Sequence, residues 1–352
     1  VSSPSAGCSD VLFELTVGHV RDETFELTVD HAKAKTFEFT VLLHTEPYHK
    51  YVLELERYVL RECESVLDHN KFKKKNQLNY DIIKYLIELC DEQESSRKRS
   101  IFYINQNKAL KQDETDRILN DIATSLHYSR TSLPISAVPK GVVIGCLKFK
   151  ESGSIAVDCT EVGDSGKEIP YSVSSIMDIE NKGVKFILLV EKDTVFLSLL
   201  DHKFYEKVPC IIITGKGTPD VSTRSFLRRL KVELYLPILG LVNGDVYGVQ
   251  ILSVYSYGSK QMPFDNENLV TPNIRWLDIW PSDIEKYDIP DESVTTLSER
   301  EIGILNTMLS VDAPIEKNRK WKAELTLMIN SKKKVEIEAL YHCGPNILLI
   351  PF

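Results

Sequence analysis

Two carboxylates in the second half of the chain stand where an α/β protein would carry metal ligands. Glu191 directly follows the apolar run FILLV, and Asp245 closes the segment LPILGLVNGD. If both runs are parallel strands, their carboxyl ends meet at one edge of the sheet, where the two acids can converge on a hard cation such as Mg²⁺. The dipeptide Asn243-Gly244 between apolar runs is also typical of a β-hairpin turn, and that alternative would require an antiparallel sheet.

A glycine-rich turn, TGKGTPD, follows another apolar run, VPCIII. It matches neither a Walker A loop nor the GxGxxG pattern. Thr214, Lys216 and the backbone of the two glycines could still approach a phosphate, and Arg224, Arg228 and Arg229 follow closely in the sequence. An ordinary tight turn explains the same residues, so both interpretations stay open at this point.

Basic residues gather in two short stretches, NKFKKKNQ and SSRKRSIFY, although the whole chain has a net charge of −8. The negative total argues against a generic nucleic-acid binder. A charge run usually marks a solvated face, but these two lie within about thirty residues of each other, which favours one shared phosphate-binding surface.

The apolar patterns around these motifs predict an α/β fold. The segments VKFILLVEKD, VPCIIITGKGTPD and LPILGLVNGD have the pattern of buried strands, and TVFLSLLDHKFY and VSTRSFLRRLKVEL have that of helices. The segment VYGVQILSVYSYG is either a helix or a strand. Near-continuous apolar strands that alternate with helices indicate a parallel sheet, which opposes the hairpin interpretation.

The earlier part of the chain has a different texture. Helical spacing occurs in HKYVLELERYVLRECESVL, YDIIKYLIELCDEQ and DETDRILNDIATSLHY, and the strand-like KGVVIGCLKF follows them. This order suggests a winged-helix domain, a small fold that often lays a helix in a DNA groove. Before it, FELTV occurs twice and FEFTV once at a spacing of twelve residues, which predicts three short strands or else a poorly ordered extension. We therefore expect an N-terminal extension (1–47), a winged-helix domain (48–150) and an α/β domain (151–352).

Composition narrows the class of protein. With 43% hydrophobic and 27% charged residues, the chain has an ordinary globular composition. No apolar stretch approaches the roughly 20 residues that cross a bilayer, so we expect no membrane partner. The seven cysteines are scattered without a CxxC pair, which predicts reduced thiols and no structural zinc. The first residues lack the basic and apolar blocks of a signal peptide.

The motifs occur in an order that resembles one family. The segments LLVEKD, PCIIITGKGTPDVSTRSFLRRL, LPILGLVNGDVYGVQILSVYSYGSK, NLVTPNIRWLDIWPSDIEKYDIP and WKAELTLMINSKKKVEIEAL are similar to the Toprim domain of topoisomerase VI A subunits and of their eukaryotic relatives, the meiotic double-strand-break transesterases. The likeness extends upstream through VPKGVVIGCLKF and KRSIFYINQ, covers residues 51–340, and leaves out the FELTV repeat. It implies an α/β architecture in which a winged-helix domain of the catabolite-activator type precedes a Toprim domain with a parallel sheet.

The resemblance implies DNA cleavage of the type IIB topoisomerase kind, in which a tyrosine becomes joined to a 5′ end. The motif RSIFY places that tyrosine at Tyr103 and the basic residue of the motif at Arg99. A phenol with an ordinary pKa of about 10 is a weak nucleophile, and nearby positive charge from Arg99 or Lys98 would favour the phenolate. Taken without the family, Tyr103 would be a packing residue, and Tyr128 in LHYSR does not match the motif.

The resemblance also implies that Toprim carboxylates bind Mg²⁺, here through Glu191 and Asp245. The family pattern is Asp-x-Asp-Pro, and this chain has Asn243 in place of the first aspartate and Val246 in place of the proline. An asparagine offers Mg²⁺ a carbonyl oxygen without negative charge, so Asn243 is a weak ligand and metal binding should be weakened. We expect Lys216, Arg224 and Lys98 to contact DNA.

Two functions remain open. The chain is either an active DNA-cleaving transesterase of the ATP-dependent type II topoisomerase A kind, acting as a homodimer, or a cleavage-deficient paralogue that dimerises with an active copy. The resemblance implies that the partners are double-stranded DNA and an ATP-hydrolysing topoisomerase VI B-like subunit, and that the location is the nucleus. Strand passage and meiotic break formation use the same residues, so the sequence does not choose between DNA topology and the initiation of meiotic recombination.

Overall fold

The computed structural model describes residues 15–20, 24–29, 37–42, 74–91, 96–97, 112–136, 139–277, 280–286, 289–311, 315 and 318–339. The chain divides into two compact units, Val1–Gln93 and Glu94–Phe352. None of the helices within the described residues is long and apolar enough to cross a membrane.

The described residues of the first unit form the sheet predicted from the repeat and helix α2 (Lys74–Asp91). Strands β1 (Leu15–Val20), β2 (Thr24–Val29) and β3 (Phe37–Leu42) pair antiparallel in sequence order, which confirms the three-strand prediction. Helix α2 (Lys74–Asp91) buries an apolar face at helical spacing, as the pattern YDIIKYLIELC predicts. The members of this face are Ile82, Ile83, Leu86 and Leu89.

The second unit is built around a six-stranded sheet with the order β14-β13-β11-β12-β6-β9. Its strands are β14 (Arg275–Trp276), β13 (Ile238–Leu241), β11 (Phe186–Val190), β12 (Cys210–Thr214), β6 (Val142–Gly145) and β9 (Lys167–Glu168). The first four are mutually parallel, and β6 and β9 add to the edge in antiparallel pairing. The mostly parallel sheet of a mixed α/β fold is therefore confirmed.

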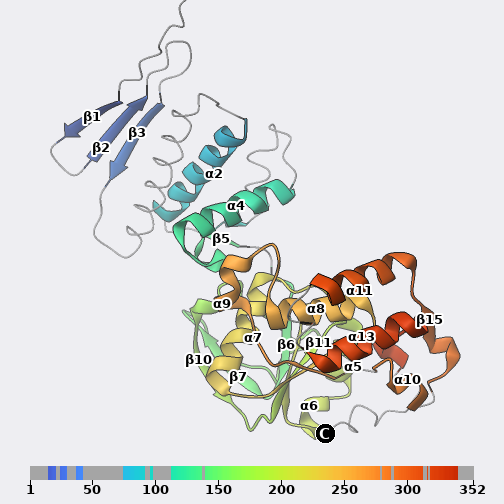
Figure 1. Ribbon diagram of the computed structural model, residues 1–352. Coiled ribbons are helices and arrows are strands. Elements are labelled where there is room, and N and C mark those ends of the chain that lie inside the picture. The colour runs from blue at the N-terminus through green and yellow to red at the C-terminus, as the bar shows by residue number, and fades with distance from the viewer. Residues whose placement is uncertain are drawn as a thin grey trace, which may run out of the picture. The chain divides into compact units, whose positions relative to one another are not determined.

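Helices cover both faces of this sheet, which explains why its central strands are continuously apolar. On one face lie α7 (Val221–Leu234) and α8 (Val246–Tyr257), whose buried residues join one hydrophobic cluster with alternate residues of β11 (Figure 1). On the other face lie α5 (Asp193–Asp201) and α6 (Phe204–Lys207), which pack against the remaining β11 residues. The segment VYGVQILSVYSYG, for which the sequence allows a helix or a strand, is thus a helix.

The strand expected to complete the winged-helix domain lies elsewhere. Residues Val142–Gly145 form β6 and pair with β12, so this segment belongs to the sheet of the second unit. The pairing crosses the boundary that we expected at residue 150, which stays a prediction. The strand had no local signal of its partner, because β6 and β12 lie nearly seventy residues apart in the sequence.

Before the sheet, helix α4 (Gln112–Leu126) runs into the short helix η2 (Arg130–Ser132). Strand β5 (Ile135–Ser136) follows and pairs in parallel with β4 (Ser96–Arg97). The first helix expected for the winged-helix domain lies outside the described residues, so that domain stays a prediction.

The remaining elements of the described residues are β7 (Leu147–Glu151), β8 (Val157–Asp158), η3 (Val173–Ser175), β10 (Ile176–Asn181), η4 (Pro263–Asp265), α9 (Asn266–Leu269), α10 (Asp283–Lys286), η5 (Asp291–Ser293), β15 (Val294–Thr296), α11 (Glu299–Val311), α13 (Arg319–Ser331) and β16 (Lys333–Val335).

Candidate metal centre

Glu191 is held at the carboxyl end of β11 by the sheet itself. Its backbone N–H donates to the carbonyl of Leu241 on the parallel strand β13 at 3.0 Å. Its side-chain Oε2 accepts from the backbone N–H of Asn243 at 2.7 Å, and the residue is buried, with 9% exposure. The parallel pairing of β11 and β13 therefore brings Glu191 to the NGD loop, as the sequence predicts.

Asp245 is fixed by a second device, because it is the N-cap of α8. Its Oδ1 accepts from the backbone N–H groups of Tyr247 at 2.9 Å and Gly248 at 2.8 Å. These are orphan donors of the first helical turn, and the positive end of the helix dipole favours a carboxylate there. A helix after Asp245 also excludes the hairpin interpretation of Asn243-Gly244.

Asn243 connects the two acids. Besides the backbone bond to Glu191, its Nδ2 donates to Oδ2 of Asp245 at 3.4 Å. Its Oδ1 accepts from the backbone N–H of Ile337 at 3.2 Å. The loop lies so close to α8 that a Cβ on Gly248 would come within 2.3 Å of the Asn243 carbonyl oxygen. Glycine is needed at that position for the close approach.

The buried carboxylates of Glu191 and Asp245 form a site where a cation would be stabilised. Burial raises the pKa of Glu191 to about 7; the hydrogen bond from the Asn243 backbone opposes this rise, and the charge of Asp245 adds to it. The nearest lysine in sequence, Lys192, donates to Glu336 at 2.7 Å and to Glu338 at 2.6 Å. Its charge is therefore shared with these two carboxylates, and its attraction opposes only part of the rise in the pKa of Glu191.

The residues present fit a magnesium ion in part. Glu191 and Asp245 supply hard carboxylate oxygens, and within the described chain Oε1 of Glu191 accepts no hydrogen bond, so it is available as a ligand. The third donor of the loop is the neutral carbonyl of Asn243, one lone pair of which is already used by Ile337. Among the residues that the structure describes, no group of three or more His, Cys, Asp or Glu side chains could hold a metal ion.

The glycine-rich turn lies next to the carboxylates. The N–H of Gly217 donates to the carbonyl of Glu191 at 2.9 Å, and Lys216 adopts a left-handed backbone with φ of 51°. The Lys216 side chain is 38% exposed, and its Nζ lies 3.4 Å from Oδ2 of Asp193. The structure therefore brings Lys216 to the same sheet edge as Glu191 and Asp245.

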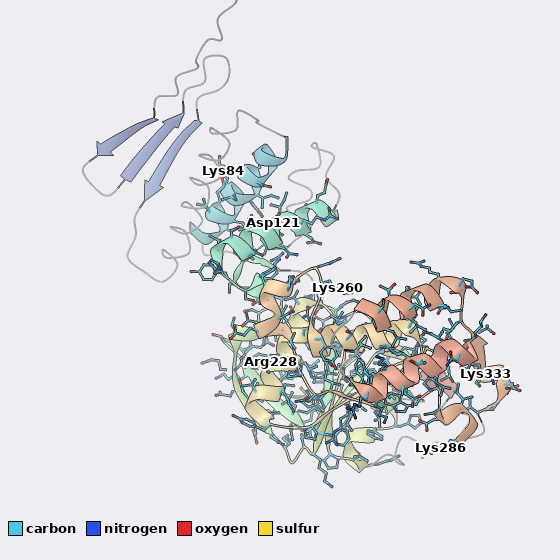
Figure 2. The ribbon with its side chains drawn as sticks, in the orientation of Figure 1. Lys84, Asp121, Arg228, Lys260, Lys286 and Lys333 are labelled. Carbon is cyan, nitrogen blue, oxygen red and sulfur yellow. The ribbon has the colours of Figure 1, made fainter. Side chains whose placement is uncertain are left out.

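Arg224 does not join this group. It is 2% exposed on the inner side of α7, so the prediction that it contacts DNA is wrong for this structure. The physical reason is its position three residues before Leu227, which puts it on the apolar face of the helix. Arg228, four residues further along α7, is only half-buried (Figure 2).

Three predicted residues, Tyr103, Arg99 and Lys98, lie outside the described residues. In the sequence they fall between β4 and α4. The sequence did not predict that residues 335–337 contact the loop of Asn243 and Gly244. There the backbone N–H of Val335 donates to the carbonyl of Gly244 at 3.3 Å. The alternation in KVEIEAL was its one signal, because Ile337 is 2% exposed while Glu336 and Glu338 pair with Lys192.

The fold and the site together define a Toprim-type domain with carboxylates at the carboxyl edge of its parallel sheet. The family model for the Toprim domain of Spo11 and of the topoisomerase 6 A subunit matches residues 186–350, and the model "Type IIB DNA topoisomerase" matches residues 80–135. The chain belongs to the family that unites Spo11 with the topoisomerase VI A subunit, as the resemblance indicated.

The relatives carry names from both branches of this family. The DNA topoisomerase 6 A subunit of Arabidopsis thaliana is 41% identical over 296 residues, which are 84% of this chain and 69% of the relative. The DNA topoisomerase 6 A3 subunit of Oryza sativa subsp. indica is 44% identical over 247 residues, 70% of this chain and 55% of the relative. Meiotic recombination protein SPO11 of Homo sapiens is 35% identical over 274 residues, 78% of this chain and 68% of the relative. The matched part is thus 55% to 69% of the length of these relatives.

Proposed function

We propose that this chain is a DNA-cleaving subunit of the topoisomerase VI A kind, which breaks DNA through a 5′-phosphotyrosyl link. The observation that carries the proposal is the pairing of Glu191 and Asp245 at one edge of the parallel sheet, in a chain of this family. Double-stranded DNA is the proposed substrate, and the nucleus is the proposed location because the relatives are named for DNA topoisomerase and meiotic recombination.

In the proposed reaction the phenolate oxygen of Tyr103 attacks a backbone phosphorus. One tyrosyl O–P bond forms, the P–O3′ bond breaks, and the 3′ oxygen leaves and takes up a proton. Arg99 would favour the phenolate and offset the charge that builds on the phosphate oxygens. Lys98 and Lys216 would hold neighbouring phosphates, which positions the DNA backbone without reading its sequence.

Glu191 and Asp245 would hold the magnesium ion, with Asn243 as a weak third donor. When bound, Mg²⁺ supplies positive charge for the scissile phosphate and the departing 3′ oxygen. The cap hydrogen bonds of Asp245 and the backbone bond to Glu191 orient both carboxylates before any ion arrives. Two copies of the chain, or one copy and a paralogue, would cut the two strands, and an ATP-hydrolysing topoisomerase VI B-like subunit would supply the ATP-dependent step.

A second function is favoured by one observation, the neutral side chain at position 243. With two carboxylates and an amide in the loop, the chain could be a cleavage-deficient paralogue that binds DNA and assembles with an active copy. The Asn243 amide satisfies the neighbouring Asp245 oxygen without a metal. Strand passage and the initiation of meiotic recombination remain alternatives within the first function.

Covalent trapping tests the proposal. The protein, with a B-type partner, is incubated with supercoiled DNA and Mg²⁺, denatured, and scored for protein-linked 5′ ends. Wild type is compared with Tyr103→Phe, with the matched control Tyr128→Phe, and with Asn243→Asp. Adducts that persist in Tyr128→Phe and vanish in Tyr103→Phe support the active enzyme. Adducts that appear only in Asn243→Asp support the cleavage-deficient paralogue. If no variant forms an adduct, the assignment of Tyr103 as the nucleophile is refuted for both functions.

A further inference from the structure

Residues 335–338, called the strap from here on, run along the loop of Asn243 and Gly244. The backbone N–H of Val335 donates to the carbonyl of Gly244 at 3.3 Å, and these two residues form an antiparallel β-bridge. The backbone N–H of Ile337 donates to Oδ1 of Asn243 at 3.2 Å. The strap therefore holds this loop both by its main chain and by the side chain of Asn243.

Apolar residues fix the strap to the sheet. Ile337 is buried in the hydrophobic cluster that also contains Val190 and Leu241, which are the last residues of β11 and β13. Val335, the last residue of β16, is buried in a smaller cluster with Ile284. The strap thus packs against the ends of the same two strands that lead to the metal-binding carboxylates.

Lys192 holds the polar side of the strap. Its ammonium donates to Oε2 of Glu336 at 2.7 Å and to Oε2 of Glu338 at 2.6 Å. An ion pair at a protein surface contributes little by itself, but here one lysine joins two acids and its side chain is mostly shielded from solvent. Because Lys192 directly follows Glu191, one peptide bond separates a metal-binding carboxylate from the residue that holds the strap.

The strap determines which way the carboxamide of Asn243 faces. Its Oδ1 accepts from the backbone N–H of Ile337, so its Nδ2 lies on the side of Asp245 and donates to Oδ2 of that acid at 3.4 Å. The reversed carboxamide would set an NH₂ group against an N–H donor and a carbonyl oxygen against a carboxylate. That arrangement loses both hydrogen bonds in a buried place, so the strap keeps an N–H donor directed at Asp245.

The same loop orients the other carboxylate. The backbone N–H of Asn243 donates to Oε2 of Glu191 at 2.7 Å, so the direction of the Glu191 side chain depends on where the strap holds the loop. Both Glu191 and Asp245 are buried, which makes these hydrogen bonds costly to lose. Through Asn243, one segment therefore supports both metal-binding carboxylates.

We infer that the strap, held by Lys192, positions Glu191 and Asp245 for a metal ion and acts on both through Asn243. Lys192 is thus a positioning residue that sets metal affinity without contacting the ion. The inference rests on the proposed function for the identity of the ion, Mg²⁺, whereas the contacts of the strap do not depend on that function. Groups that orient metal ligands typically change metal affinity on the order of ten- to a hundredfold.

Replacing Lys192 gives a test in which two effects have opposite signs. Lys192→Met removes a positive charge next to Glu191 and leaves the two acids of the strap unpaired, so charge alone would raise the Mg²⁺ affinity. A loosened strap would lower it. The matched control is Lys216→Met, which removes a lysine at the same sheet edge whose ion-pair partner is Asp193 rather than a strap residue. Lys192→Arg keeps the charge and the donors.

Titration calorimetry with Mg²⁺ and amide exchange of Ile337 in chelator are measured for each full-length protein. We expect Mg²⁺ to bind about tenfold or more weakly to Lys192→Met than to wild type, and at least as tightly to Lys216→Met as to wild type. Lys192→Arg should recover most of the affinity. Unchanged or tighter binding in Lys192→Met, or no recovery in Lys192→Arg, overturns the inference.

Amide exchange separates a failure of the strap from a failure of the proposed function. If wild type binds no Mg²⁺, the proposed metal centre fails, and the exchange of Ile337 then decides whether Lys192 holds the strap. Protection of the Ile337 amide that is lost in Lys192→Met and kept in Lys216→Met supports the strap. Equal protection in the two variants, or an unprotected amide in wild type, overturns it.

Discussion

Replacing Asn243 by aspartate tests the electrostatics of the loop most sharply. In the wild type the Asn243 amide lies 3.4 Å from Oδ2 of Asp245 and donates to it. Asn243→Asp would put two negative oxygens at about this distance. In an effective dielectric of about 20, their repulsion is on the order of 5 kcal/mol, an upper value because side chains shift and protons bind. We therefore expect the free energy of unfolding without metal to fall by about 1 to 3 kcal/mol.

Magnesium should offset this loss of stability. A third carboxylate replaces a neutral donor, so we expect Mg²⁺ to bind at least about tenfold more tightly to Asn243→Asp than to wild type. Each tenfold gain in affinity adds about 1.4 kcal/mol to the stabilisation at saturating Mg²⁺. The variant should thus be less stable than wild type in a chelator and should gain more from the ion.

The assay is urea unfolding with chelator and with excess Mg²⁺, together with titration calorimetry. Asn181→Asp is a matched control, because Asn181 also accepts a backbone N–H, from Val184 at 2.7 Å, but lies on β10 away from the carboxylate pair. Mass spectrometry of position 243 checks that the Asn-Gly pair has not deamidated. An Asn243→Asp protein with unchanged stability in chelator and unchanged Mg²⁺ affinity would refute the electrostatic reasoning.

Single residues elsewhere in the Toprim domain give three further predictions. Because the pKa of Glu191 is raised to about 7, Mg²⁺ affinity should fall about tenfold per pH unit below that value, which calorimetry checks. The free energy of unfolding of the metal-free protein should fall as pH rises from about 4.5 to about 7, since the folded state keeps the proton that the unfolded state loses. Urea titrations across this range measure that fall. Burial raises the pKa of Glu301, but hydrogen bonds from Lys334 and Ser298 outweigh it and lower the pKa to about 2. Glu301→Gln should therefore lower the free energy of unfolding by about 2 kcal/mol. In wild type the stabilisation from the Glu301 carboxylate should be lost as pH falls from about 4.5 to about 2. Gly248→Ala should lower the free energy of unfolding by about 2 to 4 kcal/mol and weaken Mg²⁺ binding, since the new Cβ meets the backbone of Asn243 at 2.3 Å. The control Gly303→Ala on α11, where a Cβ meets open space, should leave the free energy of unfolding unchanged or raise it in the same urea titrations.

The central strands of the sheet, and the positions of the carboxylates at their ends, could be predicted from the sequence. The runs FILLV and ILGL are apolar without alternation, which is the pattern of a parallel strand covered on both faces. Once both are parallel neighbours, the geometry of the sheet brings Glu191 to the NGD loop. Periodicity also determined the apolar face of α2 and the helical character of α7.

The features that the sequence did not reveal are contacts between distant segments. Nothing local indicates that β6 pairs with β12, or that the Ile337 N–H bonds to Asn243 across 94 residues. The hydrogen bond from the backbone N–H of Arg130 to Asp265 spans a still longer separation of 135 residues. Arg224 is a different case, because its spacing from Leu227 already placed it on the apolar side of the helix, and the expectation of a DNA contact gave more weight to charge than to periodicity.

The most direct test of the proposed reaction is to identify the amino acid that carries the DNA. Adducts formed with Mg²⁺ are digested with nuclease and protease, and the peptide that bears a nucleotide is sequenced by mass spectrometry. We predict a 5′-phosphotyrosyl group on Tyr103, lost when Glu191 or Asp245 is replaced by alanine. A nucleotide on any other residue, such as Tyr128, or an adduct that forms equally well without both carboxylates, would contradict the proposed chemistry.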